Sequence, residues 1–184
     1  MSLPLSSAQL GAIKTVATQA PFGKGSDTVV DTAVRDTLQI DADKVTMTNP
    51  AWHAALQALV GQVAGRLGIS PDHARAELYK ILLYEKGGHF KTHQDTEKES
   101  GMFGTMVVQF PSQYSGGAIA VRHAGVEREF DMGGKIPRHC TISIMSPSMP
   151  TASTRSAKSR TAAGLWRSTR SAGIRPGRRR PLRR

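Results

Sequence analysis

The segment between residues 76 and 131 constrains the fold most, because it reads as short strands separated by glycine-containing turns. Residues 76–86 form an apolar, strand-like run, and residues 105–110 form a second one. Residues 118–123 and 126–131 flank an Ala-Gly pair, which is typical of a β-hairpin. Strands joined in this way suit a double-stranded β-helix, or jelly roll. We therefore expect an α+β protein with a jelly-roll core.

Two helices are expected before these strands. Apolar residues recur at helical spacing within residues 6–19, and residues 27–40 read as an extended segment. Asn49 can cap a second helix that has Pro50 at its first position and Gly68 at its end. One face of this helix carries an apolar stripe, for which we expect simple core packing: Trp52, Leu56, Leu59, Val60, Val63 and Leu67.

Size and composition favour a single intracellular domain. A chain of 184 residues is long enough to bury a core. It has no apolar run of the ~20 residues that a membrane span needs. Its first residues lack the basic and apolar regions of a signal peptide, and its one cysteine, Cys140, excludes an internal disulfide. We expect a cytoplasmic or nuclear protein with no membrane partner.

The positive charge is confined to one end of the chain. The net charge is +11, yet residues 1–135 hold 13 Lys and Arg against 14 Asp and Glu. Residues 136–184 hold 12 Lys and Arg and no acid, and they show no lasting hydrophobic period. Such a segment buries too little apolar surface to offset its ordering entropy. We expect a domain over residues 1–135 and a basic, disordered tail over residues 136–184, which alone could bind nucleic acid.

The tripeptide from His93 to Asp95 is the strongest candidate for chemistry. Residues two apart on a strand point to the same face, so an imidazole and a carboxylate would converge. They are two of the three ligands in the two-His, one-carboxylate site that holds Fe(II). The pair alone is a weak signal, since such tripeptides arise often by chance. Its context, with Gly87-Gly88 before it and Thr96-Glu97-Lys98 after it, makes it more specific.

This context resembles the iron- and 2-oxoglutarate-dependent dioxygenases of the prolyl 4-hydroxylase type. It is most similar to a fungal branch that carries the segment Leu-Tyr-Glu-x-Gly-x-x-Phe-x-x-His-x-Asp-Thr-Glu-Lys, which residues 83–98 match. Residues 20–25 and 49–52 are similar to that branch as well. The resemblance covers roughly residues 5–134. In this family helices buttress the outside of the jelly roll.

The resemblance implies a cofactor set and roles for individual residues. His93 and Asp95 would bind Fe(II), and Tyr84 would hydrogen-bond the co-substrate 2-oxoglutarate, with ascorbate as a further cofactor. Thr96 would help to orient Asp95 without itself binding the metal. No catalytic residue beyond the metal ligands is implied. The substrate, a protein or a small molecule, is not identified by the sequence.

Two family elements have no match in this chain. The family places a His-Glu-Val strand, and then an Arg or Lys for the distal carboxylate of 2-oxoglutarate, after the His-x-Asp pair. His139 is the last histidine, and no Glu follows it. His89 and His123 are expected to be exposed loop or hairpin residues rather than ligands. We therefore expect an impaired dioxygenase whose last strands are missing.

A change of reading frame would explain this loss. Residues 149–156 read Met-Pro-Thr-Ala-Ser-Thr-Arg-Ser, and reading the same codons out of frame permits Ala-Asp-Gly-Glu-His-Glu-Val. Three alternatives stay open. The tail could be genuine, the protein could be a non-catalytic binder whose tail contacts a polyanion, or His139 could complete the metal site of a full enzyme.

Overall fold

A computed structural model describes residues 6–93, 100–110 and 114–131, together with the backbone of residues 141–145, 151–154 and 161–170. The helices are α1 (Ser7–Val16) and α2 (Pro50–Arg66), and short 3-10 turns cover Ala42–Lys44 and Pro71–His73. The strands are β1 (Thr18–Gln19), β2 (Phe22–Lys24), β3 (Asp27–Val29), β4 (Arg35–Asp36), β5 (Leu38–Asp41), β6 (Ala74–Tyr84), β7 (His89–His93), β8 (Met102–Gln109), β9 (Ile119–His123), β10 (Val126–Phe130), β11 (Thr141–Met145), β12 (Thr151–Thr154) and β13 (Thr161–Arg170).

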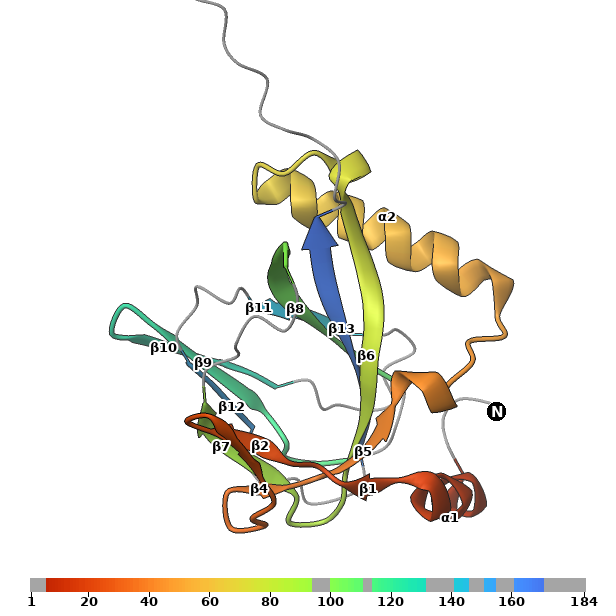
Figure 1. Ribbon diagram of the computed structural model, residues 1–184, viewed down its shortest axis with the longest axis vertical. Coiled ribbons are helices and arrows are strands. Elements are labelled where there is room, and N and C mark those ends of the chain that lie inside the picture. Colours follow the sequence, from red (N-terminus) through yellow and green to blue (C-terminus); the bar gives the residue numbers. More distant parts are fainter. Residues whose placement is uncertain are drawn as a thin grey trace, which may run out of the picture.

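Two sheets make up the body of the molecule (Figure 1). The major sheet has the strand order β1-β5-β6-β13-β8-β11, and the minor sheet has the order β10-β9-β12-β7-β4. Consecutive strands from β6 to β9 alternate between the two sheets. The expected strands around β6 and β8 and the hairpin of β9 and β10 are confirmed. Ala124 and Gly125 take positive φ values of 48° and 79° in that hairpin turn, as a two-residue turn of this kind requires.

The end of the chain differs from the sequence-based expectation. We expected the last strands to be missing and residues 136–184 to form a disordered tail. The backbone instead places β13 between β6 and β8, and β12 between β9 and β7. A ladder of this kind uses backbone N–H and C=O groups, and it can form without the side-chain pattern that the prediction relied on. The division of the chain at residue 135 stays a prediction.

Both predicted helices are confirmed, and each has a side-chain cap. Ser6 accepts a hydrogen bond from the Gln9 amide at 3.2 Å, and its own amide donates to Gln9 Oε1 at 2.9 Å. This reciprocal pair is a capping box. Asn49 Oδ1 accepts from the Ala51 amide at 3.0 Å, with Pro50 at the first position of α2. No helix in the described part of the chain is long and apolar enough to cross a membrane.

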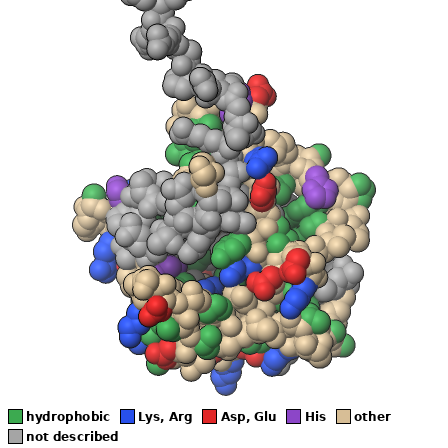
Figure 2. All heavy atoms as spheres, viewed as in Figure 1, with side chains coloured by type: hydrophobic (Ala, Val, Ile, Leu, Met, Phe, Trp, Pro, Cys, Tyr) green, Lys and Arg blue, Asp and Glu red, His purple; other side chains and the backbone are tan. Residues whose placement is uncertain are grey.

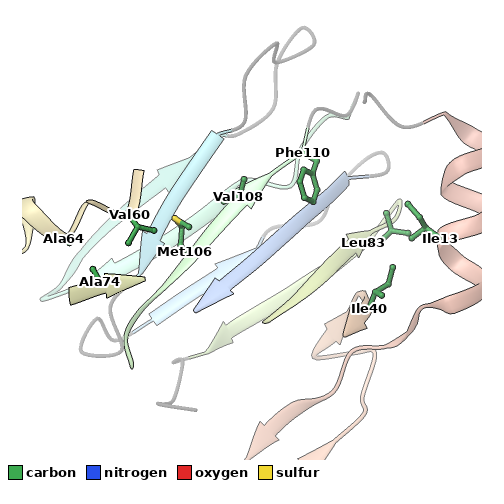
Figure 3. Close-up of a cluster of buried hydrophobic side chains, with 9 residues drawn as sticks. All are labelled: Ile13, Ile40, Val60, Ala64, Ala74, Leu83, Met106, Val108 and Phe110. Atoms are coloured by element: carbon green, nitrogen blue, oxygen red, sulfur yellow. The ribbon is translucent and has the colours of Figure 1, made fainter. Parts of the chain in front are cut away.

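The helices cover one face of the major sheet and enclose the main hydrophobic cluster (Figure 3). Ile13 of α1 packs at the Leu83 end of β6, and Val60 of α2 packs at the Met106 part of β8. Leu83, Met106 and Val108 are the largest fully buried side chains among the described residues. Most of the predicted stripe on α2 packs here too, since Trp52, Leu56 and Leu59 lie against this cluster. Leu67, the last residue of the predicted stripe, is instead 50% exposed, because it follows the end of the helix.

A bulge in β6 changes which of its residues face the helices. Leu165 of β13 pairs with Lys80 and Trp166 pairs with Leu78, so Tyr79 is the extra residue. Leu78 before the bulge and Leu83 after it both belong to the helix-facing cluster. The opposite face of the major sheet, here called the inner face, then carries Gln39, Lys80, Leu82, Tyr84, Thr105 and Gln109.

Candidate metal centre

Strand β7 carries the predicted metal ligand, and a tight turn sets its start. Residues 85–88 connect β6 to β7, with Gly87 at φ 86° and the Gly88 amide donating to the Glu85 carbonyl at 2.8 Å. A Cβ atom on Gly88 would lie 2.9 Å from the Glu85 carbonyl oxygen and 3.0 Å from that of Asp36. Only glycine fits such a close approach of backbone to backbone. The turn therefore fixes where β7 enters the minor sheet.

His93 is held by an aromatic stack at the end of β7. Its ring stacks on Phe90 with centroids 3.6 Å apart and an interplanar angle of 18°. The Arg35 guanidinium carbon lies 4.4 Å from the centroid of the same Phe90 ring. Residues three apart on a regular strand point to opposite faces. The register shift against β12 between Phe90 and His93 lets both rings turn to one face.

A hydrogen bond further orients the His93 ring. Its Nδ1 lies 2.9 Å from the carbonyl oxygen of Lys91, so a neutral ring would carry its proton on Nδ1. Nε2 is then the nitrogen that a metal would take, because a backbone carbonyl commonly anchors the other nitrogen of a ligating histidine. His93 is half-buried, so the ring is neither in the core nor fully exposed.

The second predicted ligand, Asp95, lies outside the described residues, as does Thr96. The convergence of His93 and Asp95 on one face therefore stays a prediction. Within the described ranges, no three His, Cys, Asp or Glu side chains form a group that could hold a metal ion. His139, the alternative third ligand, also falls outside them.

The two histidines that we expected to be exposed loop or hairpin residues, His89 and His123, follow that expectation only in part. His123 is exposed at the end of β9 beside the hairpin turn, as expected. His89 is a half-buried residue at the start of β7, and not an exposed loop residue. Its ring nitrogens lie 3.1 Å from the Gly87 carbonyl oxygen and 3.4 Å from that of Ala33. These contacts give His89 a structural role in the turn before β7.

Tyr84 ends β6 on the inner face, where it is buried beside Leu82. It lies directly before the turn that leads into β7, whereas His93 lies at the other end of β7. The hydrogen bond from Tyr84 to a co-substrate stays a prediction.

The inner face contains polar residues that the sequence reasoning missed. Gln39, Lys80, Thr105 and Gln109 are each at most 8% exposed. Lys80 Nζ donates to Gln39 Oε1 at 2.8 Å, and Gln39 Nε2 donates to Asp41 Oδ1 at 3.1 Å. The signal in the sequence was the lysine inside the apolar, strand-like run of residues 76–86.

Gln109 and Tyr114 form a second polar contact at the edge of this face. The Tyr114 hydroxyl donates to Gln109 Oε1 at 2.7 Å. Burial raises the pKa of Tyr114 above its ordinary value of 10.0; the hydrogen bond with Gln109 opposes this shift, and the negative charge of Asp131 adds to it. Gln109 Nε2 is buried and has no hydrogen-bond partner among the described residues.

The arrangement of strands matches solved structures of one class. No protein-family model and no curated protein sequence matches the chain. A prolyl hydroxylase from Trichoplax adhaerens, solved with a hypoxia inducible factor oxygen degradation domain peptide, is similar at a TM-score of 0.61 and 12% identity over 87% of this chain and 74% of that one. A Pseudomonas putida prolyl-4-hydroxylase gives a TM-score of 0.54 at 14% identity over 76% and 74%.

A 2OG-Fe(II) oxygenase family oxidoreductase from Burkholderia pseudomallei gives a TM-score of 0.52 at 14% identity over 89% of this chain and 79% of that chain. At these identities the likeness establishes the fold alone. The chain therefore has the mixed sheets and few helices of the fold found in 2OG-Fe(II) oxygenases.

Proposed function

We propose that this chain is a member of the Fe(II)- and 2-oxoglutarate-dependent dioxygenases, built on a double-stranded β-helix, and that it is impaired in turnover. The observation that carries the proposal is the anchored ring of His93 at the end of β7, in a fold shared with 2OG-Fe(II) oxygenases. Imidazole nitrogen and carboxylate oxygen are donors that suit Fe(II). His93 and Asp95 would hold the metal.

Bound iron with 2-oxoglutarate would supply the oxidation of a substrate C–H bond. The residues of this chain position the reactants. The Lys91 carbonyl and the Phe90 ring fix the His93 imidazole, so that Nε2 has one direction. Tyr84, at the end of β6, would donate a hydrogen bond from its hydroxyl to the co-substrate. The substrate would be a protein or a small molecule, and ascorbate would act as an additional reductant.

The proposed impairment follows from the ligand set. No histidine in a His-Glu-Val context follows Asp95, and no counterpart of the family's Arg or Lys for the distal carboxylate is recognisable in residues 136–184. Two protein ligands hold a metal more weakly than three. A full enzyme would then require another residue, of which His139 is the first candidate.

Turnover of 2-oxoglutarate to succinate tests this proposal. The purified chain, with saturating Fe(II) and ascorbate, is expected to release no more succinate than a His93→Ala variant. Turnover that His93→Ala abolishes would contradict the impairment and show that another residue completes the site. Restoring the alternative reading frame from residue 149 should add the His-Glu-Val strand and bring back turnover, and genomic DNA across codons 130–184 would show which frame is natural.

A second candidate function rests on the charge distribution. Residues 136–184 carry 12 Lys and Arg without an acid, whereas acidic and basic side chains are interspersed over the described part of the face in Figure 2. Such a basic segment could bind nucleic acid or another polyanion by neutralising phosphates. Replacing the arginines at 178–180, 183 and 184 by Ser should abolish a salt-dependent binding of duplex DNA. Binding that survives this change would exclude the tail as the contact. Either function suits a cytoplasmic or nuclear protein.

A further inference from the structure

We propose that Arg35 is a positioning residue for His93, and that it acts through the ring of Phe90. Arg35 lies in β4, in the N-terminal part of the chain and outside the motif that suggested the metal site. The inference rests on the proposed function, because it gives Arg35 this role only if His93 binds a metal. It assigns the orientation of the ligand to two strands instead of one.

Arg35 is fixed at the edge of the minor sheet, beside the strand that carries His93 (Figure 1). It is the direct partner of Phe90 in the antiparallel pairing of β4 with β7. The Lys91 amide donates to the Val34 carbonyl at 2.9 Å, so the bonds of this ladder flank the pair of Arg35 and Phe90. Side chains lie closer in such a pair than in one that shares its hydrogen bonds. The backbone therefore brings the Arg35 side chain next to the Phe90 ring.

The guanidinium group of Arg35 is held between a carbonyl and this ring. Arg35 is 8% exposed, and its Nη1 donates to the Pro21 carbonyl at 2.6 Å. Its guanidinium carbon lies 4.4 Å from the centroid of the Phe90 ring. Arginine suits such a place, because its planar group can cover an aromatic face while its N–H groups donate in the plane. The Pro21 carbonyl thus anchors the guanidinium group that covers Phe90.

His93 covers the other face of the same ring. The imidazole and phenyl centroids are 3.6 Å apart, with 18° between the planes. One face of a phenyl ring has no room for an imidazole and a guanidinium group at these two distances, so Arg35 and His93 lie on opposite faces. Phe90 is 8% exposed, and a rotation of its ring would break both contacts. Arg35 therefore restricts the plane of the His93 ring by way of Phe90.

Proton NMR of the metal-free chain tests the stack itself. Ring protons that lie over an aromatic face resonate upfield, so the His93 signals, assigned by their loss in His93→Ala, should lie upfield of those of the exposed His123. Arg35→Lys keeps the positive charge and removes the planar group. It should move the His93 signals toward those of His123. Arg128→Lys, at an exposed arginine of β10 in the same sheet, is the matched control and should leave them in place.

Calorimetry with Mn(II) tests whether the stack positions a metal ligand. Arg35→Lys and Phe90→Leu should each weaken binding of Mn(II) by about 3- to 10-fold, because a ring that is no longer held must be ordered when the metal binds. The double variant should bind no more weakly than Phe90→Leu alone, since Arg35 acts through Phe90 and the two losses are not additive. Arg128→Lys should bind like the parent.

The outcomes separate this inference from the proposed function. His93 signals that stay in place in Arg35→Lys, or losses that add in the double variant, would overturn the inference and leave the proposed function standing. Phe90→Leu keeps the test independent of whether an Arg35 variant folds: if it binds Mn(II) as tightly as the parent, the inference is wrong. A parent chain that binds no Mn(II) would overturn both.

Discussion

The major and minor sheets differ in what they contribute to the molecule. The major sheet has the long strands β6 and β8 and carries the hydrophobic cluster with both helices. The minor sheet has shorter strands, and every residue of its edge strand β10 is exposed. His93 nevertheless belongs to the minor sheet, on β7. We infer that the major sheet supplies most of the stability, whereas the minor sheet carries the proposed metal ligand. Substitutions in the two sheets should therefore have different consequences.

The largest expected difference comes from one substitution made in each sheet. Val108→Ala in β8 removes two buried methyl groups and should lower the free energy of unfolding by about 2–3 kcal/mol, because a cavity is left behind. Val126→Ala in β10 changes a residue that is 58% exposed and should stay within about 0.5 kcal/mol. Urea denaturation of the parent and both variants gives the free energies of unfolding to compare. Equal losses would show that the minor sheet is as important for stability as the major one.

A smaller effect is expected at the turn that links the sheets. Gly88→Ala would bring a Cβ atom to 2.9 Å from the Glu85 carbonyl oxygen, so the turn must shift, at a cost of about 1–3 kcal/mol. Gly65→Ala is the matched control, since nothing lies within 4 Å of its Cβ position in α2. Alanine should stabilise that helix by about 0.5–1 kcal/mol. Thermal unfolding measures the stability of both variants. A Gly88→Ala variant as stable as the parent would contradict the close approach of the Gly88 and Glu85 backbones.

The smallest effect concerns pH. The pKa of Tyr114 is raised on folding, so the folded state binds its proton more tightly than the unfolded state. The stabilisation that this hydroxyl contributes is fully present below pH 10.0, its ordinary pKa. It is lost as the pH rises through the higher pKa of the folded state. Tyr114→Phe should therefore lose less stability than the parent as the pH rises from about 9 to about 11, a range centred on the ordinary tyrosine pKa. An identical pH profile for both proteins would contradict the shift.

Much of the fold was predictable because its signals are local. Capping residues such as Asn49, helical spacing of apolar residues and the Ala-Gly hairpin turn act within a few residues of chain, and each is confirmed. The strands β12 and β13 were not predicted, because backbone pairing with distant strands leaves no periodic pattern in a basic, Ser-rich segment. Long-range pairing of this kind is not readable from one sequence.

The candidate site was predictable only in part. The resemblance pointed to His93, and the structure adds the Phe90 ring and the Lys91 carbonyl that orient it. Lys80 was read as part of an apolar strand, since the bulge at Tyr79 that turns it to the inner face depends on pairing with β13. Gln109 gave no signal, because its burial and its unsatisfied amide exist only in the folded chain.

Metal binding at β7 tests the central claim most directly. Titration of the full chain with Mn(II), followed by electron paramagnetic resonance, should show one site that His93→Ala removes and His123→Ala leaves unchanged. His123 is an exposed histidine of the same sheet and is therefore the matched control. Urea denaturation should show that both variants are as stable as the parent within about 1 kcal/mol. A chain that binds Mn(II) equally well with and without His93 would contradict the assignment of the metal site to the minor sheet.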